Sequence, residues 1–219
     1  MMKEKIFYIT TLGMLLSACS PSNLPPKSTH NVPSEFNQLS YTPSNNTKPS
    51  FTSNSMENKQ NFSEVKTEIS SYTTPILTSD KKRYHNITLV RDRLNGYILK
   101  NGETFSYNEV CGPYGKKDGF QKADIQTGKG KTKKEYGGGV CQLSSTLYNA
   151  VKDLDIEIIE RHHHSTPVNY VPKNQDATIS LANNLDFKFT NVTGYDLSFR
   201  VTSTEDSLTV CVDSITKTP

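Results

Sequence analysis

Residues 136–151, with the sequence YGGGVCQLSSTLYNAV, are the stretch around which this 219-residue chain is organised. The three consecutive glycines, residues 137–139, have no side chain to pack, and they allow a sharp turn and the close approach of another molecule. Apolar residues then recur at helical spacing, at positions 143, 147, 150, 151 and 154. This spacing predicts an amphipathic helix over about residues 142–153, with Cys141 in its first turn.

Cys141 is predicted to lie where a thiol ionises readily. At a helix N-terminus, unpaired backbone N–H groups and the positive end of the helix dipole both favour the thiolate and lower its pKa from the free value of about 8.5. The pattern therefore predicts a nucleophilic cysteine. The alternative is a small buried hydrophobic residue at a helix start. The preceding glycines favour the nucleophile, because a merely buried cysteine does not need them.

The composition indicates one folded domain and an additional unfolded segment. The chain is 33% hydrophobic and 21% charged, with a formal net charge of +3 at pH 7. Because the basic residues are scattered, we expect no nucleic-acid partner. The one dense basic run, residues 129–134, is interrupted by glycine and is typical of a solvated loop. Binding of an anionic surface polymer is the alternative for that run.

The N-terminus has the features of a secretory signal. Two lysines precede a short apolar run, residues 6–16, which is too short to span a bilayer. The run leads into Leu-Ser-Ala-Cys at residues 16–19, which resembles the lipobox of bacterial lipoproteins. That resemblance implies a signal peptide over residues 1–18 and a lipid on Cys19 that holds the protein on the outer face of the cytoplasmic membrane. An ordinary cleaved signal is the alternative.

A linker is expected between the lipidation site and the domain. Residues 19–66 are rich in Ser, Thr, Asn, Pro and Lys, with few apolar residues and no periodicity. This composition is typical of disorder, and a flexible coil of this length has an r.m.s. reach of about 35–40 Å. The domain at residues 67–219 would then search the layer outside the membrane, which in a bacterium is the cell wall.

The remaining cysteines leave the disulfide question open. Cys111, Cys141 and Cys211 are an odd number for a protein outside the cytosol. Either Cys111 pairs with Cys211 and leaves Cys141 free, or all three are free thiols. A bridge depends on Cα separations, which the sequence does not report.

Upstream of the glycine turn, the sequence predicts an extended segment over residues 68–77 and then a helix. Asn86 is a good N-cap, and an Asn-Gly pair at residues 95–96 is a typical helix stop. The apolar face of this helix consists of Ile87, Val90, Leu94 and Tyr97.

A hairpin and a long loop are expected next. Residues 97–99 and 104–110 have strand-like composition, and the turn at residues 100–103 between them is a hairpin signal. The following stretch, residues 111–134, is rich in Gly and Lys and is predicted to be a loop anchored by Phe120. Loops of this length are usually functional or mobile, so we expect this one to cover a substrate.

After the central helix the apolar period changes from 3.6 to 2. Short strand-like runs lie at residues 156–161, 168–171, 177–182, 185–191, 197–202 and 208–212. Strands joined by such short turns can only be antiparallel. The predicted fold class is therefore α+β, an antiparallel β-sheet with two or more helices and a cysteine at the N-terminus of the central helix.

The histidine run that follows the helix supplies a base for the thiol. Acyl chemistry on cysteine needs one group that takes and returns a proton and another that orients it. His164 lies 23 residues after Cys141, which fits a helix, a turn and a returning strand, and Asp176 follows 12 residues later. We predict Cys141 as nucleophile, His164 as base and Asp176 as orienting carboxylate. The N–H groups of Gly138 and Gly139 would face a developing oxyanion.

The neighbours of the base have competing roles. In a strand, His162 and His164 lie on one side and His163 on the other. A zinc site is the alternative to the catalytic cluster, because Cys141, His162 and His164 all carry zinc-ligating atoms. No pair of cysteines or histidines has the spacing of a zinc finger, so we expect no metal and no cofactor. Arg161 is predicted to bind a substrate carboxylate, with an exposed strand-end arginine as the alternative. Surface or turn-capping roles are the alternative for the histidines and the aspartate.

With these motifs in view, residues 72–212 resemble the VanW domain family. The resemblance is carried, in chain order, by Arg83 with Asn86-Ile87, Leu94-Asn95-Gly96, Gly102-Glu103 with Phe105-Ser106-Tyr107-Asn108, Gly112, Gly119-Phe120, Gly137-Gly138-Gly139-Val140-Cys141-Gln142, Ser145-Thr146-Leu147-Tyr148-Asn149, Glu160-Arg161 with His164-Ser165, Tyr170-Val171-Pro172 and Asp176-Ala177-Thr178. Two positions depart from the family: Asn101 replaces a usual Pro, and Asn174 replaces a usual Gly. Asn tolerates a left-handed turn, so neither change endangers the site.

The resemblance implies a reaction. Some VanW domains are regarded as L,D-transpeptidases that use the cysteine of the Gly-Gly-Gly-x-Cys-Gln motif. By that resemblance, Cys141 would attack the third residue of a peptidoglycan stem peptide, release the terminal D-Ala and pass the acyl group to the side-chain amine of a neighbouring stem, making a 3-3 cross-link. Gln142, His162, Ser165 and Tyr170 join the expected substrate-binding residues.

Two other functions stay open at this point. One is a cysteine peptidase or amidase that trims wall peptides, and the other is a non-catalytic wall-binding or glycopeptide-resistance accessory protein. The sequence indicates no oligomeric state.

Overall fold

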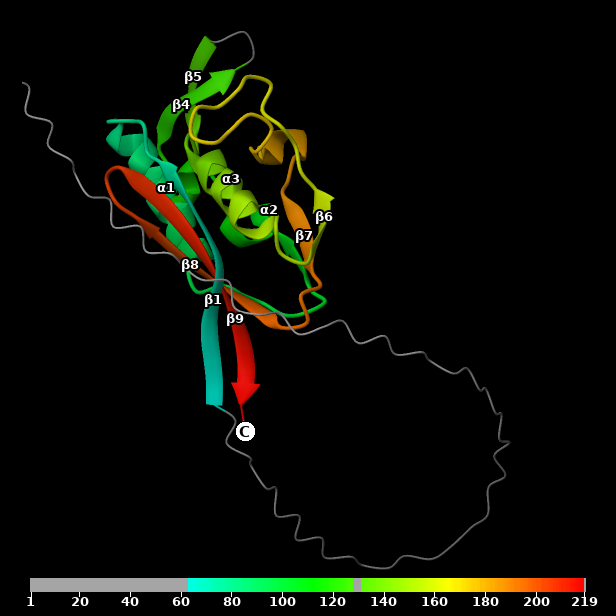
Figure 1. The fold of residues 1–219 in the computed structure, drawn as a ribbon. Coiled ribbons are helices and arrows are strands. Elements are labelled where there is room, and N and C mark those ends of the chain that lie inside the picture. Colours follow the sequence, from blue (N-terminus) through cyan, green and yellow to red (C-terminus); the bar gives the residue numbers. More distant parts are fainter. Residues whose placement is uncertain (1–62, 128–130, 219) are drawn as a thin grey trace, which may run out of the picture. The chain divides into compact units, whose positions relative to one another are not determined.

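The computed structural model describes residues 63–127 and 131–218 (Figure 1). The expected signal peptide at residues 1–18, the lipidation site Cys19 and most of the expected linker lie outside the described residues. The first strand begins at Ser63, four residues before the expected start of the domain at residue 67. In the described part of the chain, no helix has the length and apolar character needed to cross a membrane.

A four-stranded antiparallel sheet with the strand order β1-β9-β8-β2 forms one side of the domain. Its strands are β1 (Ser63–Pro75), β2 (Ile98–Leu99), β8 (Asp196–Ser203) and β9 (Ser207–Thr218). β1 pairs with β9 along its whole length, with one register shift between Glu68 and Ser70. Side chains that alternate along β9 enter the core, because successive residues of a strand face opposite sides. They are Leu208, Val210 and Val212.

A second sheet and a separate hairpin complete the strands that the structure describes. The second sheet has the order β3-β7-β6, with β3 at Thr104–Ser106, β6 at Ile156–Glu160 and β7 at Lys188–Asn191. The hairpin pairs β4 (Lys122–Thr127) with β5 (Lys131–Tyr136). β5 ends next to the glycine turn and so leads the chain directly into the central helix.

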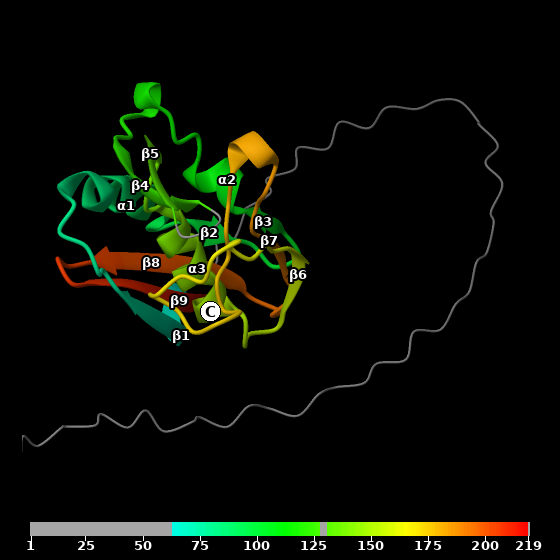
Figure 2. The ribbon, with the colours of Figure 1, turned by 90° about the horizontal axis from the view of Figure 1, so that it is seen from above.

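The central helix α3 (Val140–Val151) lies between the two sheets, as Figures 1 and 2 both show. It contacts β1, β9 and helix α1 (Lys81–Leu94). On its other side, the Tyr148 ring meets Phe187 edge-on, with ring centroids 5.8 Å apart. The helix begins two residues before the predicted position, and the antiparallel sheets with helices confirm the predicted α+β class.

The remaining helical segments are short. They are α2 (Tyr107–Cys111), η1 (Lys116–Asp118) and η2 (Leu181–Asn183). Between the sheets, an aromatic cluster forms much of the core, with ring centroids 5.1 to 6.4 Å apart, and it comprises Tyr97, Phe105, Phe187, Phe189 and Phe199.

The predicted N-cap of α1 is wrong, although its predicted end is confirmed. Asp80 caps the helix by accepting from the Lys82 N–H at 2.9 Å, and Asn95 with Gly96, at φ 83°, ends it. Asn86 instead lies inside the helix and is fully buried. Its side chain forms tertiary hydrogen bonds, a use of Asn that a single sequence does not distinguish from a cap.

The predicted hairpin at residues 97–110 is also wrong. β2 pairs with β8 and β3 pairs with β7, so the turn between them crosses from one sheet to the other. The second predicted strand ends at Ser106, whose hydroxyl accepts from the Glu109 N–H at 3.2 Å and caps α2. The second half of the predicted strand is therefore a short helix, which begins directly after its N-cap serine.

Three further predictions need correction. The predicted loop at residues 111–134 contains the β4–β5 hairpin, whose mostly polar sequence has little apolar alternation beyond Ala123 and Ile125. Its anchor Phe120 is buried as predicted and stacks edge-on against Tyr114. The predicted strands at residues 168–171 and 177–182 are not formed; apart from isolated bridges such as His162 with Thr178, this region is irregular.

The disulfide alternatives are resolved in favour of free thiols. In the part of the chain that the structure describes, Cys111, Cys141 and Cys211 are all unbridged. Cys111 is buried in α2, and burial raises the pKa of its thiol to about 12. Cys211 lies partly buried on β9.

Asn86→Ala should destabilise the domain more than expected from the few atoms that the substitution removes. The Asn86 amide donates to the carbonyls of Gln121 and Gly138, each at 2.9 Å, and its oxygen accepts from the Gln121 N–H at 2.8 Å. Truncation would leave these buried groups unpaired, so we expect the free energy of unfolding to fall by about 2–4 kcal/mol, measured by urea denaturation. Asn183→Ala, at an exposed asparagine, is the matched control, and an equal effect in both variants would contradict the prediction.

Candidate active site

The glycine turn is packed too closely for side chains. A Cβ on Gly138 would lie 2.6 Å from the Ala123 carbonyl oxygen of β4. Gly139 adopts φ 111°, a conformation that favours glycine, and a Cβ there would lie 2.9 Å from Arg83 Cγ of α1. The turn is therefore wedged between β4 and α1, and this wedging fixes Cys141 as the second residue of α3.

The backbone donors of this turn divide into two groups. The Gly138 N–H donates to a β5 carbonyl at 3.4 Å, and the N–H groups of Val140 and Gln142 donate to carbonyls of the turn itself. Within the described residues, the N–H groups of Gly139 and Cys141 have no acceptor, as is usual at the start of a helix. Of the two N–H groups predicted to face an oxyanion, that of Gly138 is used within the fold and that of Gly139 has no acceptor in the described part of the chain.

Cys141 is partly buried, and its surroundings favour the thiolate. Its Sγ lies 3.5 Å from the Ile179 carbonyl oxygen and 3.8 Å from Thr178 Oγ1. Burial raises the pKa of the thiol, but a hydrogen bond from His164 and the positive charge of that imidazole outweigh the burial and lower the pKa below its ordinary value. The site therefore holds a thiol that ionises more easily than a free one.

His164 and Asp176 form the second half of the site. The His164 Nδ1 and the His164 backbone N–H both lie 2.6 Å from Asp176 Oδ2, which leaves Nε2 of the ring for the thiol. Burial lowers the His164 pKa, but the thiol and the carboxylate raise it overall. Burial likewise raises the Asp176 pKa, yet the bonds from His164 and His163 lower it to about 2. The structure thus brings Cys141, His164 and Asp176 together.

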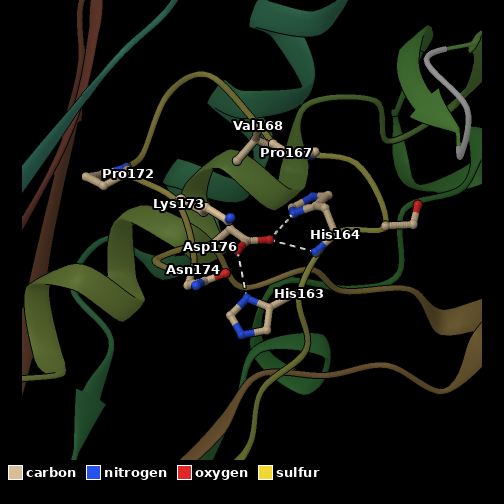
Figure 3. A pocket seen from close by; sticks show the side chains of 9 residues that line it. His163, His164, Pro167, Val168, Pro172, Lys173, Asn174 and Asp176 are labelled. Atoms are coloured by element: carbon tan, nitrogen blue, oxygen red, sulfur yellow. Dashed lines mark hydrogen bonds and ion pairs between the residues drawn. The ribbon is translucent and has the colours of Figure 1, made fainter.

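The predicted alternation of the three histidines is wrong. Because residues 161–165 form no regular strand, His163 and His164 both point at Asp176, as Figure 3 shows. His163 Nδ1 lies 2.8 Å from Asp176 Oδ1, whereas His162 Nε2 lies 2.9 Å from Glu160 Oε1. His162 is therefore turned toward Glu160 and away from the Asp176 carboxylate.

The candidate zinc ligands Cys141, His162 and His164 are not gathered at one point. His162 is committed to Glu160, which also accepts from Lys188 at 2.9 Å. Over residues 63–127 and 131–218, no group of three or more His, Cys, Asp or Glu side chains is arranged to hold a metal ion.

Arg161 packs against the rest of the irregular segment here called the histidine loop, residues 161–176, and its predicted contact with a substrate carboxylate stays a prediction. Its guanidinium donates to the carbonyls of Asn174 and Asp176, each at 3.2 Å, and lies 4.1 Å from the centroid of the Tyr148 ring. It also lies 3.1 Å from His163 Nε2. Because a guanidinium only donates, that nitrogen accepts, and the proton of His163 is on Nδ1 facing Asp176.

Gln142 is part of the framework as well. The side chain is 1% exposed, its amide donates to the Pro75 carbonyl at 2.9 Å and to Thr74 Oγ1 at 3.2 Å, and its oxygen accepts from Arg83 at 3.2 Å. The predicted contact with substrate is therefore corrected, because Gln142 ties β1 to α3 and to α1.

Ser165 and Tyr170 follow the three histidines along the chain, in the histidine loop. Ser165 is exposed and lines a pocket of about 220 Å³ beside the His164–Asp176 pair (Figure 3). Tyr170 is partly buried; burial raises the pKa of its hydroxyl, and the neighbouring thiol of Cys141 raises it further. Tyr170 is thus within electrostatic range of the thiol, and Ser165 lines the pocket beside the imidazole. The pocket is lined by His163, His164, Ser165, Pro167, Val168, Pro172, Lys173, Asn174 and Asp176.

Asn174 adopts φ 63°, the left-handed conformation expected where the family usually has Gly. Sequence reasoning missed two contributors, Arg83 beside the glycine turn and His163 on the carboxylate. The signal for Arg83 was its place among the motifs that carry the family resemblance, whereas the expected N-cap at Asn86 left Arg83 outside the predicted helix. No comparable signal distinguished His163 from its neighbours.

The fold and the site define an α+β protein in which a Cys-His-Asp cluster is assembled between the first turn of a central helix and an irregular loop. Residues 82–212 match the family model described as VanW like protein, and the chain belongs to the VanW family. The match includes α1, the glycine turn, α3 and the histidine loop.

Two curated relatives were found among known proteins. The chain is 39% identical over 124 residues to the uncharacterized protein YoaR of Bacillus subtilis, which covers 57% of this chain and 40% of YoaR. It is 32% identical over 105 residues to the vancomycin B-type resistance protein VanW of Enterococcus faecalis, which covers 46% of this chain and 38% of that protein. The matches thus span about two-fifths of each relative's length. No solved structure matches the chain.

Alkylation of Cys141 by iodoacetamide should continue at pH values where an ordinary thiol is protonated. We expect the rate to rise with a midpoint below the free value of about 8.5, because only the thiolate reacts. His164→Ala should move the midpoint to higher pH, since burial then acts without the opposing imidazole.

The measurement is peptide-resolved mass spectrometry over a pH series. Cys111 and Cys211 serve as internal controls, because burial raises the pKa of both thiols. An unchanged midpoint in His164→Ala would show that the imidazole does not set the thiol pKa.

Proposed function

We propose that this protein is a peptidoglycan L,D-transpeptidase that works through a cysteine acyl-enzyme. The observation that carries the proposal is the Cys141-His164-Asp176 cluster, in which the thiol pKa is lowered and the imidazole pKa is raised. A thiolate paired with an imidazolium is the state from which acyl transfer to sulfur begins.

In the first half-reaction, Cys141 Sγ attacks the carbonyl carbon of the third stem residue. The N–H groups of Gly139 and Cys141 are the donors available to the tetrahedral oxyanion. Collapse of the intermediate forms the thioester and breaks the amide bond to the terminal D-Ala, whose amine leaves with the proton that His164 donates. Asp176 keeps the ring oriented through Nδ1.

In the second half-reaction, the side-chain amine of a neighbouring stem attacks the thioester. His164 takes the proton of that amine, the new amide bond forms and the C–S bond breaks, which returns Cys141 to the thiolate. The same imidazole thus acts first as acid and then as base, which a histidine with both neighbours in contact can do.

The comparisons support the wall context of this proposal. The chain belongs to the VanW family, and one relative is by name a vancomycin resistance protein, which supports a cell-wall or resistance-related role. The proposal places the domain outside the cytoplasmic membrane, held by lipid on Cys19, where stem peptides lie within reach of the tether.

The proposal is tested by incubating the purified protein with disaccharide-tetrapeptide and following the products by mass spectrometry. We expect a cross-linked dimer with loss of D-Ala, and no product with Cys141→Ala. Shortening of the monomer alone would favour a peptidase or amidase, because water would then finish the reaction. Unchanged substrate with retained binding would favour a non-catalytic wall-binding protein.

The two histidines on Asp176 should differ in this assay. His164→Ala should lower kcat by about 10²–10⁴-fold, because it removes the proton carrier. His163→Ala should keep most of the turnover, since its ring is half exposed and its hydrogen bonds within the described residues are to the carboxylate and to Arg161. Equal losses in both variants would show that the base is misassigned.

A further inference from the structure

Arg83 lies beside the glycine turn and has no role in the chemistry described so far. It is the third residue of α1, and its side chain packs against Gly139, where a Cβ would lie 2.9 Å from Arg83 Cγ. Its terminal nitrogen donates to Gln142 Oε1 at 3.2 Å. Gly139 and Gln142 lie two residues before and one residue after Cys141, so Arg83 contacts the segment that carries the nucleophile.

The guanidinium of Arg83 is the least satisfied of the five arginines in the chain. Among the described residues, each of the other four donates to at least two acceptors, and these arginines are Arg91, Arg93, Arg161 and Arg200. Arg83 donates to one neutral amide oxygen, and no carboxylate in that part of the chain forms an ion pair with it. A guanidinium has five donors, so most of them are left for a ligand.

The position of this charge is costly in the absence of a ligand. Arg83 is only partly exposed, and it lies in the first turn of α1, where the helix dipole disfavours a cation. The first turn of α1 contains no acidic residue, and the Asp80 carboxylate that caps the helix accepts from the Lys82 N–H and forms no ion pair with Arg83 in the described part of the chain. Gln142, which is held by β1, fixes the guanidinium in place, as a binding group requires.

Tyr170 indicates which groups surround the Arg83 guanidinium. Burial and then the Cys141 thiol raise the pKa of the Tyr170 hydroxyl, and the charge of Arg83 opposes them. The Tyr170 hydroxyl is therefore within electrostatic range of both the thiol and the guanidinium, in keeping with the contacts of Arg83 to Gly139 and Gln142.

We propose that Arg83 binds the free terminal carboxylate of the residue that leaves. This inference rests on the proposed function, because it takes the scissile bond to be the last one of a stem peptide. The leaving residue carries its carboxylate within one residue of the attacked carbonyl, a Cα separation of about 3.8 Å. Arg83 contacts Gly139 and Gln142, which lie within two residues of Cys141, and a guanidinium binds a carboxylate through two parallel hydrogen bonds.

The consequence is specificity for a chain end. The carboxylate stays ionised and bound to Arg83 while the amide C–N bond breaks, and it departs with the released amino acid. A peptide that continues beyond this residue, or that ends in an amide, offers no anion to Arg83. The site would then act on the last bond of a free-acid stem.

The test compares a disaccharide-tetrapeptide with its C-terminal carboxamide. For Arg83→Gln we expect kcat/KM with the free acid to fall at least about tenfold while the value with the amide stays the same, because a charged hydrogen bond to the carboxylate is lost. Arg83→Lys should recover part of the loss, since it keeps the charge without the paired donors. Lys82→Gln, an exposed neighbour, removes the same charge and should leave both substrates unaffected.

A binding measurement separates this inference from the proposed function. With Cys141→Ala as the background, calorimetry should show the free acid binding at least about tenfold more tightly than the amide, and addition of Arg83→Gln should abolish that difference. Preferential binding without turnover by the native protein would uphold the carboxylate site and refute the transpeptidase. Equal binding of acid and amide would overturn the role of Arg83. So would an equal fall in affinity or in kcat/KM for both substrates in Arg83→Gln.

Discussion

The carboxylate of Asp176 is the interaction on which the site depends. It lies in a loop without regular strand pairing. It accepts hydrogen bonds from the His163 ring, the His164 ring and the His164 backbone N–H. These contacts hold one imidazole toward the thiol and lower the carboxyl pKa to about 2. Without the negative charge, the imidazolium would lose its partner and the thiol would revert toward its protonated form.

The polar side of α3 sets the distance between this carboxylate and the thiol. Ser144 Oγ donates to the Ala177 carbonyl at 2.5 Å, Ser145 Oγ accepts from the Ala177 N–H at 3.0 Å, and Asn149 donates to the Gln175 carbonyl at 2.7 Å. The apolar side of the same helix is in the core. One helix therefore carries the nucleophile and also holds the loop that activates it, so the two halves of the site cannot shift independently.

Sequence reasoning reached what local patterns encode. The period of 3.6 located α3, and residue chemistry selected Cys141, His164 and Asp176, which the structure places together. It could not reach the pairing of strands distant in sequence, so the expected hairpin at residues 97–110 proved to join two sheets. Side chains with two chemically reasonable uses were also ambiguous: Asn86 as a cap or a tertiary bridge, and Arg161 as a ligand group or a support.

The pairing of β1 with β9 has a mechanical consequence. A pull on the chain before Ser63 acts along β1, whose backbone hydrogen bonds run perpendicular to the strand and share the strain in shear. Near the far end of that strand, Thr74 contacts both Thr146 and Gln142 of α3. Tension entering the domain at its first residue would therefore be resisted along the whole ladder before it reached the helix that carries the thiol.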